Sequence, residues 1–260
     1  MLHEILINKR SELAEVRSRI APGAAERQVR DLPPVRSLRR ALTASSSVAI
    51  IAEIKRKSPS KGILARAVDP AALAAQYEAG GASAISVLTD GRYFGGSIKD
   101  LTLARSQMSL PVLRKDFIVE ELQIHESRVA GADAVLLIVA ALGARDLVHL
   151  HESALKVGLE ALVEVHNEQE IEVAIRVGAR IIGINNRNLK TFEVNPSTTE
   201  RLRSLIPSDV VCVSESGVTS REDIERLKKI GVDAALVGER LMTSLDPEAA
   251  LRELIGGGND

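Results

Sequence analysis

Eight short apolar segments recur along the chain, and none alternates cleanly between apolar and polar residues. They are rich in Val, Ile, Leu and Ala and occupy residues 48–54, 83–88, 110–113, 133–139, 160–165, 180–184, 209–213 and 233–237. A strand with one face in water alternates, whereas a strand covered on both faces is apolar throughout. The pattern therefore predicts eight buried strands of a parallel sheet.

Amphipathic segments of helical length separate most of these runs. Pairs such as Asp69–Pro70 and Asp246–Pro247 are typical helix starts, and Gly131 is a typical stop. The predicted helices cover residues 69–80, 120–130, 145–157, 167–177, 196–205, 219–230 and the segment from 246 on.

The turns from helix to strand also resemble one another: AGGASAISV, AGADAVLLI, VGARIIGIN and IGVDAALVG. Strands that alternate with helices indicate an α/β fold with a parallel sheet. Eight repeats favour closure into a (β/α)8 TIM barrel. The rival is an open doubly wound sheet, which usually has fewer strands, and no G-x-G-x-x-G motif follows the first strand here.

Residues 1–45 precede this alternation and form a polar, helical extension with a break at Pro33–Pro34. A single (β/α)8 barrel typically needs about 250 residues. We therefore expect residues 1–260 to form one barrel domain that carries residues 1–45 as an N-terminal helical extension. The sequence leaves open whether this extension is a lid over a cleft or an interface.

Composition narrows the possible partners. The formal net charge is −1 and aromatic residues make up 2%, without tryptophan, which argues against a nucleic-acid surface and against attraction to an acidic membrane. No run reaches about 18 apolar residues, and the start lacks a signal-peptide core, so we expect a cytoplasmic protein with no membrane span. The single cysteine, Cys212, lies in an apolar run and fits a reducing compartment.

Polar residues follow seven of the eight predicted strands. In βα barrels the active site lies at these C-terminal strand ends. The fourth strand instead ends in apolar residues and is expected to wall one side of the site. A charged residue after a strand is often only a solvated loop residue or half of a structural ion pair, but convergence from several strands favours an active site. The residues at these strand ends are Glu53, Lys55, Thr89, Asp90, Lys115, Asp116, Glu164, Asn185, Asn186, Arg187, Ser214, Glu215, Ser216, Glu239 and Arg240, with the glycines Gly217 and Gly238 among them.

The turns after strands seven and eight suggest an anion site. Ser216–Gly217 and Gly238–Glu239 are small turns that expose backbone N–H groups. In this fold these two loops, with a short helix N-terminus, commonly bind phosphate. Ser58 in the first loop adds a hydroxyl. A glycine after a strand can be only a turn, but two such turns at these positions favour phosphate binding.

The lysines and carboxylates suggest proton transfer. A neighbouring cation, Lys55 or Arg187, is expected to lower the pKa of Lys115 and suit it to general acid catalysis. Apolar neighbours are expected to raise the pKa of Glu164. Schiff-base chemistry at Lys115 is the rival use. Metal binding has little support: there is no H-x-H or HExxH, and surface positions are expected for His125, His149, His151 and His166.

Several motifs together resemble a known family. They are IAEIKRKSPSKG, LTD-x4-GGS, LRKDFIV, LLIVAAL, LVEVH, IGINNRNL, VSESGV and ALVGERLM, and in order and spacing they are similar to those of indole-3-glycerol phosphate synthases of tryptophan biosynthesis. The resemblance covers essentially the whole chain and implies a (β/α)8 barrel. It also implies ring closure of 1-(2-carboxyphenylamino)-1-deoxyribulose 5-phosphate to indole-3-glycerol phosphate, CO2 and water, with no metal and no organic cofactor.

The resemblance implies roles for individual residues. Lys115 of LRKDF matches the general acid that protonates the substrate ketone, and Glu164 of LVEVH matches a carboxylate that transfers protons during dehydration. Lys55 matches the lysine that meets the anthranilate carboxylate and is a further candidate for the acid/base steps. Glu53 and Asn185 match residues that orient the anilino end.

Other positions match the walls of the family's pocket. They are Arg187 beside the reacting centre, Glu215 and Ser216 near the sugar, Ser58, Gly217, Gly238 and Glu239 around the phosphate, and Phe94, Phe117 and Leu136 against the aromatic ring. The expected ligand is a small phosphorylated substrate. The chain is expected to be a monomer or weak homodimer, with association with other tryptophan-pathway enzymes as a possibility. Two hypotheses compete: another phosphosugar barrel, such as an isomerase or Schiff-base aldolase, and a phosphate-ligand binder without catalysis.

Overall fold

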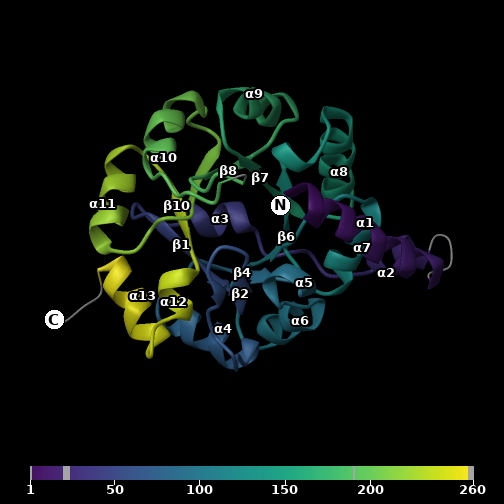
Figure 1. Cartoon of the computed structure of the whole chain (residues 1–260), viewed down its shortest axis with the longest axis horizontal. Coiled ribbons are helices and arrows are strands. Elements are labelled where there is room, and N and C mark those ends of the chain that lie inside the picture. The colour runs from purple at the N-terminus through teal and green to yellow at the C-terminus, as the bar shows by residue number, and fades with distance from the viewer. Residues whose placement is uncertain (1, 20–23, 190, 257–260) are drawn as a thin grey trace.

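The computed structural model describes residues 2–19, 24–189 and 191–256. Within these ranges eight parallel strands form a closed barrel, which Figure 1 shows ringed by helices. Each strand pairs with the next along the chain, and the first pairs with the last. The predicted TIM barrel is confirmed and the open sheet excluded. The strands are β1 (Ala49–Ile54), β4 (Ala84–Leu88), β5 (Val112–Lys115), β6 (Ala134–Ile138), β7 (Glu160–Val165), β8 (Ile181–Asn185), β9 (Val211–Glu215) and β10 (Ala234–Val237).

Two apolar clusters explain why the strands lack a polar face. Ile51, Leu113, Leu162 and Val213 belong to a cluster that fills the barrel interior. The residues between them on each strand, such as Ile50, pack outward against the helices in a second, larger cluster. Successive side chains of a strand alternate between these two environments. Both are apolar, so the alternation leaves no trace in hydropathy until the strand ends.

Helices fill most of the connections, and several begin at the predicted signals. Asp69 caps α4, where its Oδ1 accepts a hydrogen bond from the Ala71 N–H at 2.9 Å. The sequence did not predict α6 or the small β2–β3 hairpin after β1. In α6 the charged residue Asp100 is buried and the apolar residue Leu103 is exposed, so the apolar residues do not mark one face. The bounds are α4 (Pro70–Ala79), α5 (Gly91–Phe94), α6 (Ile98–Ser106), α7 (Glu121–Val129), η1 (Val139–Ala141), α8 (Ala144–Lys156), α9 (Glu168–Arg176), α10 (Ser197–Leu202), η2 (Arg203–Leu205), α11 (Arg221–Lys229), α12 (Glu239–Met242) and α13 (Pro247–Ile255), with β2 (Lys57–Ser58) and β3 (Gly62–Ile63).

The helices before β1 reach both ends of the barrel. They are α1 (Leu2–Arg19), α2 (Ala24–Val29) and α3 (Leu38–Leu42). Leu38 and Leu42 of α3 are buried in the interior cluster beside the first residues of the strands, so α3 closes the bottom of the barrel. In Figure 1, α1 begins near the centre of the view and runs outward past α7. None of the described helices is long and apolar enough to span a membrane.

Candidate active site

A cavity of about 760 Å³ opens at the C-terminal ends of the strands. Leu2 and Ile5 of α1 also line it, so the first helix covers part of its mouth. The structure brings to this one cavity every residue to which the family resemblance assigns a role. These are Glu53, Lys55, Ser58, Phe94, Lys115, Phe117, Leu136, Glu164, Asn185, Arg187, Glu215, Ser216, Gly217, Gly238 and Glu239.

A buried ammonium group lies among carboxylates at the base of this cavity. Nζ of Lys115, at the end of β5, lies 3.3 Å from Oε2 of Glu215 and 3.5 Å from Oε2 of Glu164. Nζ of Lys55 lies 2.5 Å from Oε1 of Glu53. These five side chains come from inward positions of β1, β5, β7 and β9 or from the residue just beyond the strand, so closing the sheet brings them onto one axis.

Two glycines make room for these carboxylates. A Cβ at Gly183 of β8 would overlap Oε1 of Glu215, and a Cβ at Gly238 would overlap Oε1 of Glu53. Neither glycine has a positive φ, so conformation does not require it. Glycine is required at both positions because a side chain there would displace a buried carboxylate. Gly183, in the motif IGINN, is a site determinant that the sequence did not single out.

The charge state of the cluster differs from the sequence-based expectation. Burial alone would lower the pKa of Lys115, but Glu215, Glu164 and Glu53 outweigh it and raise that pKa above its usual range. The predicted lowering by Lys55 or Arg187 was wrong, because the Lys55 ammonium binds Glu53 and the Arg187 guanidinium donates to Ser60 and to the Phe192 carbonyl. Lys115 is therefore an ammonium at neutral pH.

The two buried carboxylates beside Lys115 are not equivalent. Burial would raise the pKa of Glu164, as predicted, but Lys115 and His166 outweigh it and lower that pKa to about 2. Burial dominates at Glu215, where Glu164 and Glu53 oppose a second negative charge, and its pKa rises to about 7. Two carboxyl groups with separated pKa values suit base and acid roles. The group with the raised pKa is Glu215, and the prediction for Glu164 was wrong.

Replacing Glu215 by glutamine is expected to stabilise the fold at alkaline pH. The folded chain keeps a proton on Glu215 up to about pH 7, whereas the unfolded chain releases it near the ordinary pKa of 4.5. Stability therefore falls as pH rises between these values. Glu215→Gln should gain up to about 3 kcal/mol at pH 8 and much less at pH 5. Urea denaturation at both pH values measures this, and a larger gain at pH 5 would contradict it.

The remaining predicted residues extend the cavity in two directions. The Phe94 and Phe117 rings lie 6.2 Å apart between centroids and form an apolar wall with Leu136. Ser216 has a φ of 66° and Gly217 a φ of 91°, so the turn after β9 is left-handed, and Ser216 Oγ donates to Asn185 Oδ1 at 3.0 Å. Ser58 belongs to β2 in the first loop, and Gly238 precedes α12.

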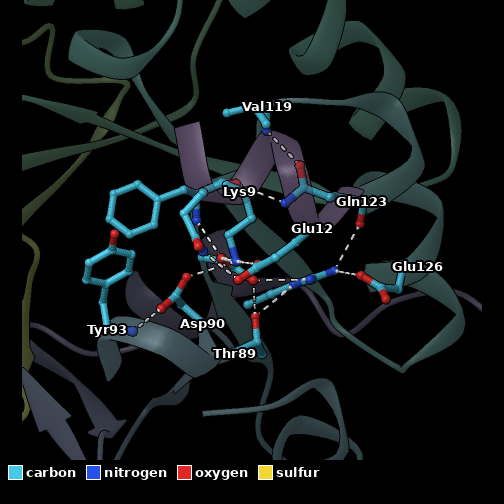
Figure 2. A network of polar contacts seen from close by, with 12 residues as sticks. Lys9, Glu12, Thr89, Asp90, Tyr93, Val119, Gln123 and Glu126 are labelled. Atoms are coloured by element: carbon cyan, nitrogen blue, oxygen red, sulfur yellow. Dashed lines mark hydrogen bonds and ion pairs between the residues drawn. The ribbon is translucent and has the colours of Figure 1, made fainter. Parts of the chain in front are cut away.

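Thr89, Asp90 and Asp116, which the sequence offered as candidate site residues, form a buried polar cluster that holds α1 on the barrel. Nζ of Lys9 lies 2.9 Å from the Asp90 carboxylate and 3.0 Å from the Asp116 carboxylate. Figure 2 shows Lys9 pointing toward Asp90. Thr89 Oγ1 donates to Asp116 Oδ2 at 2.5 Å, and Arg114 lies 3.2 Å from the same oxygen. All five side chains are buried. The ends of β4 and β5 thus anchor the first helix to the barrel.

The histidines also differ from their predicted surface positions. His125 and His151 are buried, whereas His149 is exposed, as expected. His166 is half-buried beside Glu164, with Nε2 3.4 Å from Oε1 of that carboxylate. His166 follows Glu164 by two residues, and residues at this spacing in an extended segment point to the same side. This spacing was the signal in the sequence that His166 belongs to the site. Nothing in the sequence indicated that Leu2 and Ile5 line the cavity, because their position depends on where α1 packs on the barrel.

Solved structures of proteins with other names share the fold of this chain. The chain is similar to thiamine phosphate pyrophosphorylase from Pyrococcus furiosus, with a TM-score of 0.59 and 17% identity over 84% of this chain and 96% of that one. It is similar to 3-hexulose-6-phosphate synthase, with a TM-score of 0.59 and 16% identity over 80% of this chain and 99% of that one. At such identities the likeness supports the barrel fold alone.

Sequence comparisons are more specific. The family model described as indole-3-glycerol phosphate synthase matches residues 2–254. The enzyme of that name from Streptomyces griseus is 48% identical over 99% of this chain and 96% of its own length. The one from Chlorobium phaeovibrioides is 49% identical over 94% of this chain and 95% of its own length. The chain therefore belongs to the indole-3-glycerol phosphate synthase family.

Proposed function

We propose that Lys115 is the general acid of an indole-3-glycerol phosphate synthase reaction in this chain, and that Glu164 is its base. The substrate is 1-(2-carboxyphenylamino)-1-deoxyribulose 5-phosphate, and the products are indole-3-glycerol phosphate, CO2 and water. One observation carries the assignment: a buried ammonium lies 3.5 Å from a carboxylate whose pKa is about 2, at the base of a cavity that all candidate residues line.

Ring closure requires a cation at the ketone. The ring carbon that bears the carboxylate attacks the ketone carbon, the new C–C bond forms, and the C=O electron pair moves to oxygen. A fixed ammonium in a site with little water stabilises that developing charge and supplies the proton. Lys115 is suited to this step because its neighbouring carboxylates keep it protonated. Departure of CO2 then returns an electron pair to the ring.

Dehydration requires a base and an acid. The hydroxyl leaves as water after it gains a proton, and the adjacent CH2 loses a proton to complete the indole double bond. Glu164 is ionised at neutral pH and suits the removal of that carbon-bound proton. Lys115 and Glu215 are the candidate donors to the leaving oxygen, since Glu215 has a pKa of about 7.

The two ends of the cavity suit the two ends of this substrate. We assign the phosphate to the turn at Gly217 and to Gly238 and Glu239, with Ser58 from the first loop. We assign the aromatic ring to the wall of Phe94, Phe117 and Leu136, and its carboxylate to Lys55. Glu53 and Asn185 orient the anilino nitrogen. Arg187 lies near the reacting centre and Ser216 near the sugar. Fixing both ends limits the search for the cyclised geometry, which can contribute several kcal/mol.

Turnover of the carboxyphenylamino substrate by the purified protein tests the function. Indole fluorescence should rise with time and saturate with substrate. Absence of product under conditions where a characterised family member is active would overturn the proposal. Borohydride in the presence of substrate provides the second arm, because a reduced covalent adduct on Lys115 would support Schiff-base chemistry instead.

The other expectations carry over as proposals. We propose a single domain over residues 1–260, a cytoplasmic location, and a monomer or weak homodimer, with contact to other tryptophan-pathway enzymes as a further possibility. Light scattering after size exclusion at micromolar and millimolar concentrations tests the oligomeric state. A stable higher oligomer would overturn it.

A further inference from the structure

His166 lies behind the proposed base, on the side away from Lys115. Glu164 directs Oε2 toward Nζ of Lys115, and its other oxygen, Oε1, lies 3.4 Å from Nε2 of His166. The second imidazole nitrogen, Nδ1, lies 3.1 Å from Oε2 of Glu170. The imidazole is thus held between two carboxylates, one in the cavity and one outside it.

The turn between β7 and α9 fixes this imidazole. The backbone N–H of His166 donates to Oε2 of Glu170 at 2.8 Å. The imidazole Nδ1 of the same residue lies against that same oxygen. The Asn167 amide donates to the other oxygen of Glu170 at 2.7 Å, and Asn167 Oδ1 caps α9 by accepting from the Glu170 N–H at 3.0 Å. Both carboxylate oxygens of Glu170 are engaged, so the ring has a rigid support.

The surroundings favour an imidazolium. Burial alone would lower the pKa of His166, but Glu164 and Glu170 outweigh it and raise that pKa to about 10. These carboxylates, from β7 and α9, are the charged groups that act on the ring among the described residues. Lys115 of β5 acts on it only through Glu164, Asn185 of β8 is neutral, and η1, which packs on α9, contributes only Val139, Ala140 and Ala141.

This arrangement matters when Lys115 has given its proton away. At that moment Glu164 loses one of its two cationic neighbours while it is still almost fully buried. A buried carboxylate without a cation takes up a proton instead, because burial disfavours its charged form. A carboxyl group protonated in that way cannot accept a proton from the substrate. A second cation on Oε1 prevents this.

We propose that His166 is a positioning residue for Glu164, whose imidazolium keeps the base ionised and oriented when Lys115 becomes neutral. The proposal rests on the assignment of Glu164 as the base. Nε2 of His166 is buried and has no hydrogen-bond partner within the described chain, although it lies at ion-pair distance from Glu164. A small movement of the Glu164 carboxylate toward His166 would form a hydrogen bond from Nε2 to Oε1. This movement becomes favourable when Lys115 is neutral and no longer attracts the carboxylate.

Two variants test the proposal through pH profiles. His166→Gln keeps an N–H donor but no charge, and kcat should fall about 10- to 100-fold with little change in KM, as for other residues that orient a catalytic group. The acid limb of kcat should move to higher pH, since Glu164 loses a cation. Glu170→Gln keeps the imidazole but removes a carboxylate that raises its pKa. The alkaline limb of the kcat profile should therefore move to lower pH by about one unit or more.

His149→Gln changes an exposed histidine on α8 and is the matched control.

A titration by NMR gives a readout that does not depend on activity. The His166 ring should titrate well above ordinary histidine in the unmodified protein and move toward ordinary histidine in Glu170→Gln. An ordinary titration in the unmodified protein, or an unchanged kcat and pH profile in His166→Gln, would overturn the inference. If the unmodified protein forms no indole product, the proposed function fails instead, and the NMR titration still reports on the charge of His166. Circular dichroism of each variant separates these effects from loss of fold.

Discussion

Lys115→Ala is expected to lower kcat/KM for indole formation by about 10³-fold or more while the barrel stays folded. The variant loses the proton donor and the cation that stabilises the developing alkoxide, each of which contributes about 10²-fold or more in comparable sites. Fluorescence turnover measures the loss. Glu215 has a pKa of about 7 and can take up a proton when the ammonium is removed, which limits the cost to stability.

A second substitution separates charge from proton donation. Lys115→Arg keeps a positive charge near Glu164 and Glu215, but a guanidinium holds its proton throughout the accessible pH range. If Lys115 acts as an acid, this variant should also be nearly inactive. Lys229→Ala, at an exposed position of α11, is the control and should turn over normally. Activity of Lys115→Arg near that of the control would show that charge alone suffices.

Lys9→Met is expected to cost about 3–5 kcal/mol of unfolding free energy. Lys9 is buried between Asp90 and Asp116, and removing one partner of such an ion pair leaves uncompensated buried charge. The pKa of Asp116 is below its usual range, because Arg114 and Lys9 outweigh burial, so this carboxylate would stay ionised at neutral pH. Urea denaturation measures the loss.

A compensated variant makes this prediction specific. Combining Lys9→Met with Asp90→Asn and Asp116→Asn removes the unpaired charge and should recover part of the loss. Lys61→Ala removes an exposed ion pair with Glu239 and should change stability by less than about 1 kcal/mol. A loss for Lys9→Met as small as that for Lys61→Ala would show that α1 contributes little to the stability of the barrel. Because Leu2 and Ile5 line the cavity, Lys9→Met should also raise KM.

The barrel was predictable because its signals are local. Each strand is covered on both faces, so apolar runs such as 133–139 mark it without knowledge of its neighbours. The candidate site followed from the same rule, since the ends of parallel strands lie together wherever the strands close. α6 was not predicted because Asp100 is buried in it while the apolar Leu103 is exposed, so its apolar residues do not follow the pattern of one helix face.

Charge partners were not predictable, because they depend on which strands become neighbours across the barrel. The sequence suggested cations beside Lys115, whereas the fold places Glu215 and Glu164 there. It gave no indication that Asp90 would meet Lys9, since the two lie in segments far apart in the sequence. His166 is an intermediate case: its spacing from Glu164 was visible, but the support from Glu170 needed the turn into α9.

The placement of α3 has a consequence for how the chain assembles. Ser37 donates to Glu160, 123 residues later, and Arg39 donates to the Asp209 carbonyl, 170 residues later. During synthesis the extension leaves the ribosome before the barrel strands, and its partners emerge only when most of the barrel has been made. Contacts between such distant segments form slowly. The extension, which is synthesised before the barrel, is therefore expected to be among the last segments to dock, and a nascent chain stalled before β9 should leave it accessible to protease.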